Sequence, residues 1–416
     1  MFTRNLRHAV EDALTDSPVV LLNGARQTGK TTLVESLRPD GAAARYLTLD
    51  DATVFSAAKS DPAGFIAGLS GPVVIDEIQR APELFIPIKA SVDRNRKPGR
   101  FLLTGSANVL MLPKLAESLA GRMEILTLWP LSQGELHGVR ETFIDRAFAS
   151  GPFEPGSGKG ARKTSMGAGS YFGAILRGGY PEIQERSAFE RRRAWFNSYI
   201  ETILQRDVRD LSNIDALSAM PRLLSLLAAR ATGLQNFAEL ALSSTIPQSS
   251  LKRYVALLES TFLIQFVRPW SGNLGQRLVK APKLYITDTG LMAHLLGVAE
   301  ERVSLDGIQK GPLLENFVVM ELRKQLAWSA VRPALYHFRT HNGAEIDVVL
   351  EDARGRLVGI EIKASASVSA ADFKWLREFA AQTGKKFHRG IVLFTGDRPV
   401  SFETSLTAAP LSDLWS

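Results

Sequence analysis

The strongest chemical signal in the sequence is a run of small, basic and hydroxyl residues at positions 24–32. It reads Gly-Ala-Arg-Gln-Thr-Gly-Lys-Thr-Thr and follows an apolar run. Its glycines allow a tight turn whose N–H groups converge on one anion, while the lysine adds a cation and the hydroxyl after it suits Mg²⁺. The spacing predicts a phosphate loop, with a plain glycine-rich turn as the alternative. The predicted nucleotide-binding residues are Gly24, Ala25, Arg26, Gln27, Thr28, Gly29, Lys30, Thr31 and Thr32.

Two adjacent carboxylates, Asp76 and Glu77, close the apolar run at 72–75. An acid at a strand tip can hold Mg²⁺, so we expect Asp76 and Thr31 to be the metal ligands. Glu77 is placed to polarise the water that attacks a γ-phosphate. The alternative is a strand end with two exposed acids. A complete phosphate loop upstream favours catalysis by Glu77 and Lys30, with ATP and Mg²⁺ as the cofactors.

Two further residues could act on the γ-phosphate. Thr104 and Ser106 follow the apolar run at 101–103, a strand that would lie beside the phosphate loop. Their hydroxyls could touch the phosphate or the water, or they could mark only a strand-to-turn transition. Arg122 follows Gly121 at a predicted helix end. It could serve a neighbouring subunit as an arginine finger, or cap its own helix by interacting with the helix dipole.

A second group of charged residues lies near the C-terminus. Asp347 belongs to one predicted strand, and Glu361 and Lys363 belong to the next. Residues two apart in a strand project from one face, so Glu361 and Lys363 can meet Asp347 across a hairpin. Two carboxylates and a lysine are what metal-dependent phosphodiester cleavage needs. The alternative is a hairpin with an exposed Glu–Lys ladder.

Residues 237–258 read as helix, short turn, helix. Apolar residues on the second helix recur at i, i+3, i+4 and i+7, which predicts that Leu251, Tyr254, Val255 and Leu258 pack inward. The opposite face carries Gln248, Ser249, Lys252 and Arg253. The run at 262–267 alternates like the strand of a wing. Such a winged helix could enter the DNA major groove, or it could serve protein contact or oligomer packing.

The elements that position these groups follow from the hydrophobic pattern. Residues 1–140 alternate short apolar runs with helical stretches, which predicts an α/β domain with a parallel sheet covered on both faces. The composition of residues 141–170 suggests a flexible linker or insertion. Residues 171–310 are expected to form a helical and winged-helix domain. Residues 311–416 should form a small α/β domain, with a helix, a hairpin, and then a helix and a strand.

The composition bounds the class of protein. A chain of 416 residues with 45% apolar and 22% charged residues is globular, which excludes disordered, collagen-like and coiled-coil classes. The absence of cysteine excludes disulfides and thiolate catalysis and fits a reducing compartment, so we expect a cytoplasmic location. No apolar run approaches the roughly 18 residues of a membrane span, so no membrane partner is expected. A net charge of +7 permits a nucleic-acid partner without requiring one.

Three stretches carry a family resemblance. The run from Pro18 to Thr32, Val-Ile-Asp-Glu-Ile-Gln at 74–79 and Leu-Leu-Thr-Gly-Ser-Ala at 102–107 resemble the AAA-type ATPase domain of a large bacterial and archaeal family. Thr104 resembles the first sensor of such ATPases. The remainder is similar to that family's C-terminal domain of unknown function 4143, through residues 178–181, 199–208, 289–291 and 339–363.

The resemblance implies a P-loop NTPase fold of the AAA type, a winged-helix middle and a nuclease-like end. The spacing of Asp347, Glu361 and Lys363 resembles the restriction-endonuclease-like motif, in which Glu315 matches an extra acid on the preceding helix. The likeness also implies ATP-coupled association with DNA. A homo-oligomeric ring is expected, with a hexamer as one possible size.

Three functions compete. The favoured hypothesis is an ATPase that couples Mg-ATP binding and hydrolysis to rearrangement of the C-terminal domains, acting on DNA. The first alternative is an ATP-regulated, metal-dependent DNA nuclease. The second is a DNA- or protein-binding module that uses ATP without hydrolysing it. Glu77 argues against this last hypothesis, because a pure binder needs no acid to polarise water.

Overall fold

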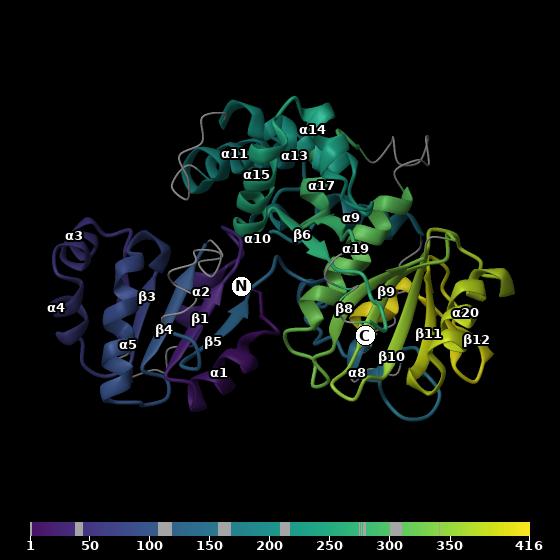
Figure 1. Cartoon of the computed structure of the whole chain (residues 1–416), viewed down its shortest axis with the longest axis horizontal. Helices are drawn as coiled ribbons and strands as arrows, with labels where there is room; N and C mark the ends of the chain where they lie inside the picture. The colour runs from purple at the N-terminus through teal and green to yellow at the C-terminus, as the bar shows by residue number, and fades with distance from the viewer. Residues whose placement is uncertain are drawn as a thin grey trace.

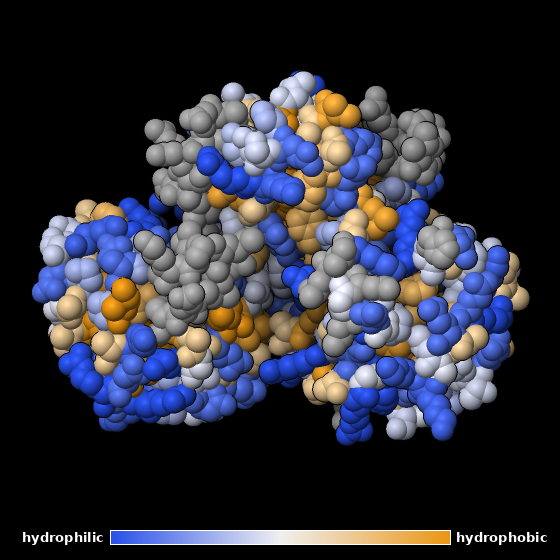
Figure 2. Space-filling view, viewed as in Figure 1, coloured by the Kyte–Doolittle hydropathy of each residue, from blue (hydrophilic) through white to orange (hydrophobic). Residues whose placement is uncertain are grey.

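The computed structural model describes residues 2–37, 45–106, 119–156, 168–208, 217–273, 275, 277, 280–299, 310–340 and 342–416. An N-terminal sheet domain and a C-terminal sheet domain stand side by side, and a mainly helical region lies above both (Figure 1). Hydrophilic side chains cover most of the face seen in Figure 2, with apolar ones scattered among them. Within the described ranges, no helix is both long and apolar enough to cross a membrane.

The N-terminal sheet has five parallel strands in the order β2-β3-β4-β1-β5. The strands are β1 (Val19–Asn23), β2 (Arg45–Thr48), β3 (Val73–Asp76), β4 (Phe101–Gly105) and β5 (Met123–Thr127). The helices are α1 (Arg7–Asp16), α2 (Lys30–Ser36), α3 (Ala52–Ser60), α4 (Pro62–Ala67) and α5 (Phe85–Arg94). Along β1, Val19 and Leu21 face one apolar core while Val20 and Leu22 face another. The sheet is therefore covered on both faces, which confirms the predicted P-loop NTPase architecture.

The middle of the chain is mainly helical with one short ribbon. Its helices are α7 (Gln133–His137), α8 (Phe143–Ala147), α9 (Ala168–Arg177), α10 (Pro181–Gln184), α11 (Phe189–Thr202), α13 (Met220–Ala229), α14 (Phe237–Ser244), α15 (Gln248–Ser260) and α17 (Thr289–Leu295). A π-helical turn, η4 (Ile203–Val208), continues α11. Strands β6 (Ile264–Val267) and β7 (Lys283–Ile286) pair antiparallel. On α15 the four predicted inward residues are buried and the four predicted outward ones are exposed, which confirms the period-based assignment of its faces.

The C-terminal sheet has six strands in the order β12-β13-β11-β10-β9-β8. They are β8 (Ala334–Arg339), β9 (Glu345–Glu351), β10 (Leu357–Lys363), β11 (Phe387–Phe394), β12 (Val400–Glu403) and β13 (Leu406–Pro410). Helices α19 (Lys310–Gln325) and α20 (Lys374–Thr383) pack on it. The expected hairpin is present as the antiparallel pair β9–β10, and β11 runs parallel to β10. Strands β8, β12 and β13 were not predicted.

The segment at 141–170 differs from the expected flexible linker in its first part. Residues 143–147 form α8, and Phe143, Phe148 and Phe153 are buried. Arg146 donates to the Asp413 carbonyl at 2.9 Å, so α8 packs against the C-terminal end of the chain. Aromatic residues hold this part in the core although its neighbours are rich in glycine. Residues 157–167 lie outside the described part of the chain.

Candidate functional site

The phosphate loop joins β1 to α2 at the carboxyl edge of the N-terminal sheet. Gly24 and Gly29 have φ values of 147° and 89°, in the region that side chains other than glycine rarely adopt. A Cβ atom on Gly24 would lie 2.2 Å from the Leu128 carbonyl oxygen, so the loop follows the end of β5 too closely for any larger residue. Gln27 also has a positive φ of 59°, and Thr28 is buried with its hydroxyl on the Ala25 carbonyl at 2.9 Å.

The side chain of Lys30 lies inside this turn. Its Nζ donates to the carbonyl oxygens of Gly24 at 2.9 Å and Ala25 at 2.8 Å, and the residue is buried. Thr31 and Thr32, the next residues of α2, are exposed. The loop thus surrounds one ammonium group with backbone that can turn its N–H groups toward an anion.

Asp76 ends β3 and faces the start of α2. The Thr31 hydroxyl lies 3.5 Å from Asp76 Oδ2, while Thr104 at the end of β4 donates a short hydrogen bond to Oδ1. The Tyr46 hydroxyl donates to Oδ2 at 2.7 Å. Burial raises the pKa of Tyr46, and the Asp76 carboxylate raises it further, so this hydroxyl stays a neutral donor. The structure therefore brings Thr31 and Asp76 together and adds Tyr46, which sequence reasoning missed.

Glu77 has a left-handed backbone, with φ of 58°. Its Oε2 accepts a short hydrogen bond from the Gln79 amide and one of 3.1 Å from the Ser106 hydroxyl. Its backbone N–H donates to Thr104 Oγ1 at 3.2 Å. The Gln79 and Ser106 side chains, which follow β3 and β4 respectively, thus hold the carboxylate at the strand tips. Thr104 and Ser106 lie beside the predicted acids because β4 lies between β1 and β3 in the sheet.

Arg122 lies at the amino-terminal ends of the strands, opposite the end that carries the phosphate loop. The next residue, Met123, pairs with Val19 at the start of β1, whereas the phosphate loop follows the end of β1. Arg122 Nε donates to Asp93 Oδ1 at 2.5 Å, and this hydrogen bond lowers the pKa of Asp93. A role on its own chain's phosphate loop is therefore out of reach, and the arginine-finger role in a neighbouring subunit stays a prediction. The segment at 107–118 before it lies outside the described residues.

Other parts of the chain contact the loop and its surroundings. Arg4 donates to the Thr28 carbonyl at 2.5 Å and to Glu135 Oε1 at 3.0 Å. From the helical region, the Tyr199 hydroxyl of α11 lies 3.4 Å from the Arg26 carbonyl, and Arg206 of η4 reaches Asp50 at 3.2 Å. Sequence reasoning missed these contacts because they join residues that are far apart in the chain.

The predicted C-terminal residues also lie together, with an unexpected lysine among them. Lys283 Nζ of β7 lies 2.8 Å from Glu315 Oε1 of α19, 2.7 Å from Glu345 Oε1 and 4.0 Å from Asp347 Oδ1. Glu361 lies beside Asp347, and its Oε2 is 4.0 Å from Lys363 Nζ. The pattern at 344–363 could reveal these acids, but no local pattern indicates Lys283. We name Lys283, Glu315, Glu345, Asp347 and Glu361 the C-terminal charge cluster.

Burial dominates the electrostatics of this cluster. Desolvation raises the pKa of Glu315 to about 7 and that of Glu361 to about 9, and the neighbouring Asp347 contributes to both. The pKa of Lys283 is also raised: burial acts to lower it, and the carboxylates more than offset that effect. In the described part of the chain, no group of three or more His, Asp or Glu side chains is arranged to hold a metal ion.

Comparisons with known proteins cover almost the entire chain. The model of an AAA domain matches residues 16–137, that of the domain of unknown function DUF8612 matches 169–302, and that of DUF4143 matches 310–414. The uncharacterized protein Rv2008c of Mycobacterium tuberculosis is 33% identical over 404 residues, which are 97% of this chain and 82% of that protein. An uncharacterized protein of Mycobacterium bovis matches equally well.

The chain belongs to the family of AAA-type P-loop proteins with a C-terminal DUF4143 domain.

Solved structures similar to this DUF4143-family protein include other P-loop proteins. The Walker-type ATPase of Pyrococcus abyssi is 16% identical, with a TM-score of 0.42, and the match covers 71% of this chain and 96% of that one. The RuvB Holliday junction branch migration motor of Thermotoga maritima is 19% identical, with a TM-score of 0.30 and coverage of 63% and 88%.

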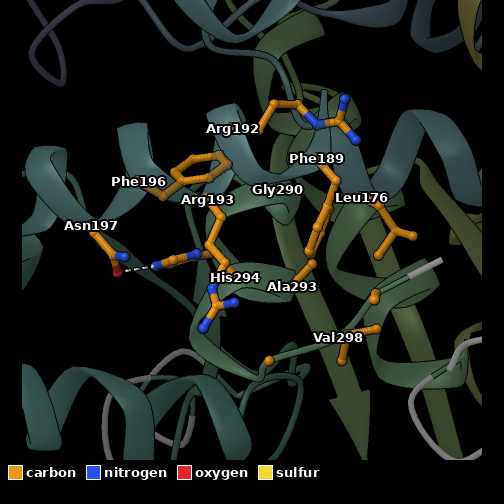
Figure 3. Close-up of a pocket in the computed structure, with 12 residues that line it drawn as sticks. Leu176, Phe189, Arg192, Arg193, Phe196, Asn197, Gly290, Ala293, His294 and Val298 are labelled. Carbon is orange, nitrogen blue, oxygen red and sulfur yellow. Dashed lines mark hydrogen bonds between the residues drawn. The ribbon is translucent and has the colours of Figure 1, made fainter. Parts of the chain in front are cut away.

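The DUF8612 region of this family member holds a separate pocket of about 430 Å³ (Figure 3). Side chains of α11, among them Phe189, Arg193 and Phe196, face Ala293 and His294 of α17. His294 Nε2 lies 3.0 Å from Asn197 Oδ1, and burial lowers the pKa of His294, with Arg193 adding to that effect. None of the residues predicted from the sequence as site residues lines this pocket.

Proposed function

We propose that this protein binds Mg-ATP in the phosphate loop and hydrolyses it, and that hydrolysis moves the helical and C-terminal regions. The observation that carries the proposal is the convergence of Lys30, Thr31, Asp76 and Glu77 at one sheet edge, although they come from two distant segments. Oxygen donors from a hydroxyl and a carboxylate, 3.5 Å apart, fit the preference of Mg²⁺. When bound there, Mg²⁺ would neutralise charge on the phosphates.

Each residue then has a defined task. The loop amides from Gly24 to Thr32 and the Lys30 ammonium bind the phosphates, which costs Lys30 its carbonyl partners. Thr31 and Asp76 hold the metal, with Thr104 and Tyr46 orienting the aspartate. Glu77 accepts the proton of the attacking water. Gln79 and Ser106, which donate to its carboxylate, either hold that carboxylate toward the phosphate or release it for this step.

The contacts between regions support the coupling part of the proposal. Tyr199 touches the loop carbonyl of Arg26, so a loop that turns around a phosphate moves a partner on α11. Asp50 accepts from Arg80, which follows Glu77 in η1 (Ile78–Arg80), at 2.5 Å, and from Arg206 of the helical region at 3.2 Å. A rearrangement near Glu77 would therefore be transmitted through Asp50 to Arg206 of η4.

DNA is the proposed partner of the helical region, and a homo-oligomeric ring is the proposed assembly. The supporting observation for DNA is that α14 and α15 are followed by the antiparallel ribbon β6–β7, an arrangement that a winged helix requires. Lys252 and Arg253 lie on the exposed face of α15. Arg122, at the sheet edge away from its own phosphate loop, supports a role at a subunit contact.

Phosphate release from purified full-length protein tests the proposal. We expect Lys30→Ala to lose both nucleotide binding and hydrolysis, whereas Glu77→Gln should keep binding and lose on the order of 100-fold or more in rate. Lys97→Ala is the matched control, because Lys97 is exposed and near the amino-terminal edge of the sheet. Equal rates for the wild type and Lys30→Ala would reject hydrolysis at this loop. Tight ATP binding by the wild type without turnover would favour a non-hydrolysing module.

A further inference from the structure

The cation in the C-terminal charge cluster comes from a different part of the chain than the acids. Lys283 belongs to β7 of the helical region, and its side chain is 2% exposed. Glu315 lies on α19, and Glu345 and Asp347 lie on β9. A buried ammonium group so close to carboxylates is stable only because they compensate its charge. The ion pairs therefore hold β7 against the C-terminal sheet.

Lys283 Nζ lies where a divalent cation held by Glu315 and Glu345 would bind. A metal bound to Glu315 Oε1 and Glu345 Oε1 would have to share these oxygen atoms with Lys283 Nζ, which lies 2.8 Å and 2.7 Å from them. A divalent ion and a buried ammonium at one position would repel each other strongly. The cluster can therefore hold either the Lys283 ammonium group or a divalent ion at this position.

Other donors also reach three of these carboxylates. Tyr285 Oη donates to Glu315 Oε1 at 2.9 Å, and the Ile362 backbone N–H donates to Asp347 Oδ2 at 2.8 Å. Arg339 lies 3.5 Å from Glu345 Oε2. These donors give Glu315, Glu345 and Asp347 further partners without a metal, which agrees with the lack of a metal-holding group among the described residues.

We propose that Lys283 is the built-in cation of the cluster, and that its ammonium keeps divalent metal out of the nuclease-like site while β7 is docked. The C-terminal domain then serves as a surface to which ion pairs of Lys283 attach the helical region. The wild-type protein has no metal-dependent nuclease centre at this position. This proposal does not depend on ATP hydrolysis at the phosphate loop.

Mn²⁺ binding to full-length protein in the absence of nucleotide tests the proposal, measured by calorimetry and electron paramagnetic resonance. We expect wild type and Asp347→Asn to bind the same number of Mn²⁺ ions. Lys283→Met should gain one Mn²⁺ site, which the double variant Lys283→Met with Asp347→Asn should lose. Lys374→Met, which removes an exposed lysine of α20, should gain none.

Thermal unfolding and plasmid cleavage complete the test. Mn²⁺ should raise the melting temperature of Lys283→Met but not that of the wild type, and wild type should not cut plasmid in Mn²⁺. A wild-type Mn²⁺ site that Asp347→Asn removes, or wild-type cleavage that requires Asp347, would overturn the proposal. So would a folded Lys283→Met that gains no site. If Lys283→Met does not fold, the comparison of wild type with Asp347→Asn decides alone.

Discussion

Asp76 is oriented by hydroxyl groups from both neighbouring strands. Tyr46 of β2 reaches Oδ2 and Thr104 of β4 reaches Oδ1, because β3 lies between β2 and β4. A carboxylate that is held on both sides presents its oxygens in one direction. Such a carboxylate is a better metal ligand than a mobile one. The position of Thr104 was predicted from the run at 101–103. That of Tyr46 was not, because only the strand order places β2 beside Asp76.

Tyr46→Phe tests this orientation. The substitution removes one hydrogen bond and keeps the ring, which should weaken the metal site by about 0.5–1.5 kcal/mol. We therefore expect the Mg²⁺ concentration for half-maximal phosphate release to rise by roughly 2- to 10-fold, with the rate at saturating Mg²⁺ little changed. An unchanged Mg²⁺ dependence in the folded variant would show that Tyr46 does not position Asp76.

The α7 helix and the segment before α1 both donate hydrogen bonds to the buried carboxyl group of Glu141. Glu141, 2% exposed, accepts from the Asn5 side chain at 2.5 Å and from the Gly134 N–H at 2.8 Å. Burial raises its pKa to about 8, and the nearby Glu321 and Glu135 also act to raise it. A carboxyl with a raised pKa stabilises the fold fully below its unfolded pKa, and that contribution is lost as the pH rises through its folded pKa.

Glu141→Gln should remove this pH dependence. In the wild type we expect the free energy of unfolding to fall between about pH 4.5 and pH 8, by at most about 1.4 kcal/mol per pH unit from this group. The glutamine variant should show a flatter profile in urea unfolding over that range. Glu185→Gln, which changes an exposed acid, is the control and should keep the wild-type slope. A wild-type slope in Glu141→Gln would contradict the assignment.

The elements near the motifs were predictable because their signals are local. The apolar runs at 72–75 and 101–103 predicted β3 and β4 within a few residues, and the 3.6-residue period predicted the buried face of α15. Strands β8, β12 and β13 were missed because short strands at or near a sheet edge carry a weak pattern. Lys283 escaped notice because its partners, Glu315 and Glu345, lie 32 or more residues later. Long-range pairing of this kind has no local signature.

The helical region contacts both sheet domains, at Asp50 near the nucleotide site and at Glu315 and Glu345 of the C-terminal domain. Arg206 and Asp50 are each close to half exposed, so their ion pair contributes little to stability, less than about 1 kcal/mol. A weak contact between regions suits a coupling role, since it can break and form at small cost. The buried Lys283 pairs instead suit a permanent attachment between β7 and the C-terminal sheet.

Arg206→Ala should therefore separate nucleotide binding from movement of the helical region. We expect nucleotide affinity within about 3-fold of wild type, as an exposed ion pair predicts, while the ATP-dependent change in distance between dyes on α3 and α14 shrinks. Arg186→Ala is the matched control, because Arg186 pairs with Glu182 inside the helical region. A full distance change in Arg206→Ala would contradict a coupling role for this contact.

A structure with Mg²⁺ and a non-hydrolysable ATP analogue tests the central claim most directly. We predict that the β- and γ-phosphates lie inside the turn at Gly24–Thr32, that Lys30 Nζ exchanges the Gly24 and Ala25 carbonyls for phosphate oxygens, and that Mg²⁺ lies between Thr31 and Asp76. An analogue bound elsewhere, or a loop that keeps Lys30 on its own carbonyls in saturating nucleotide, would contradict the account.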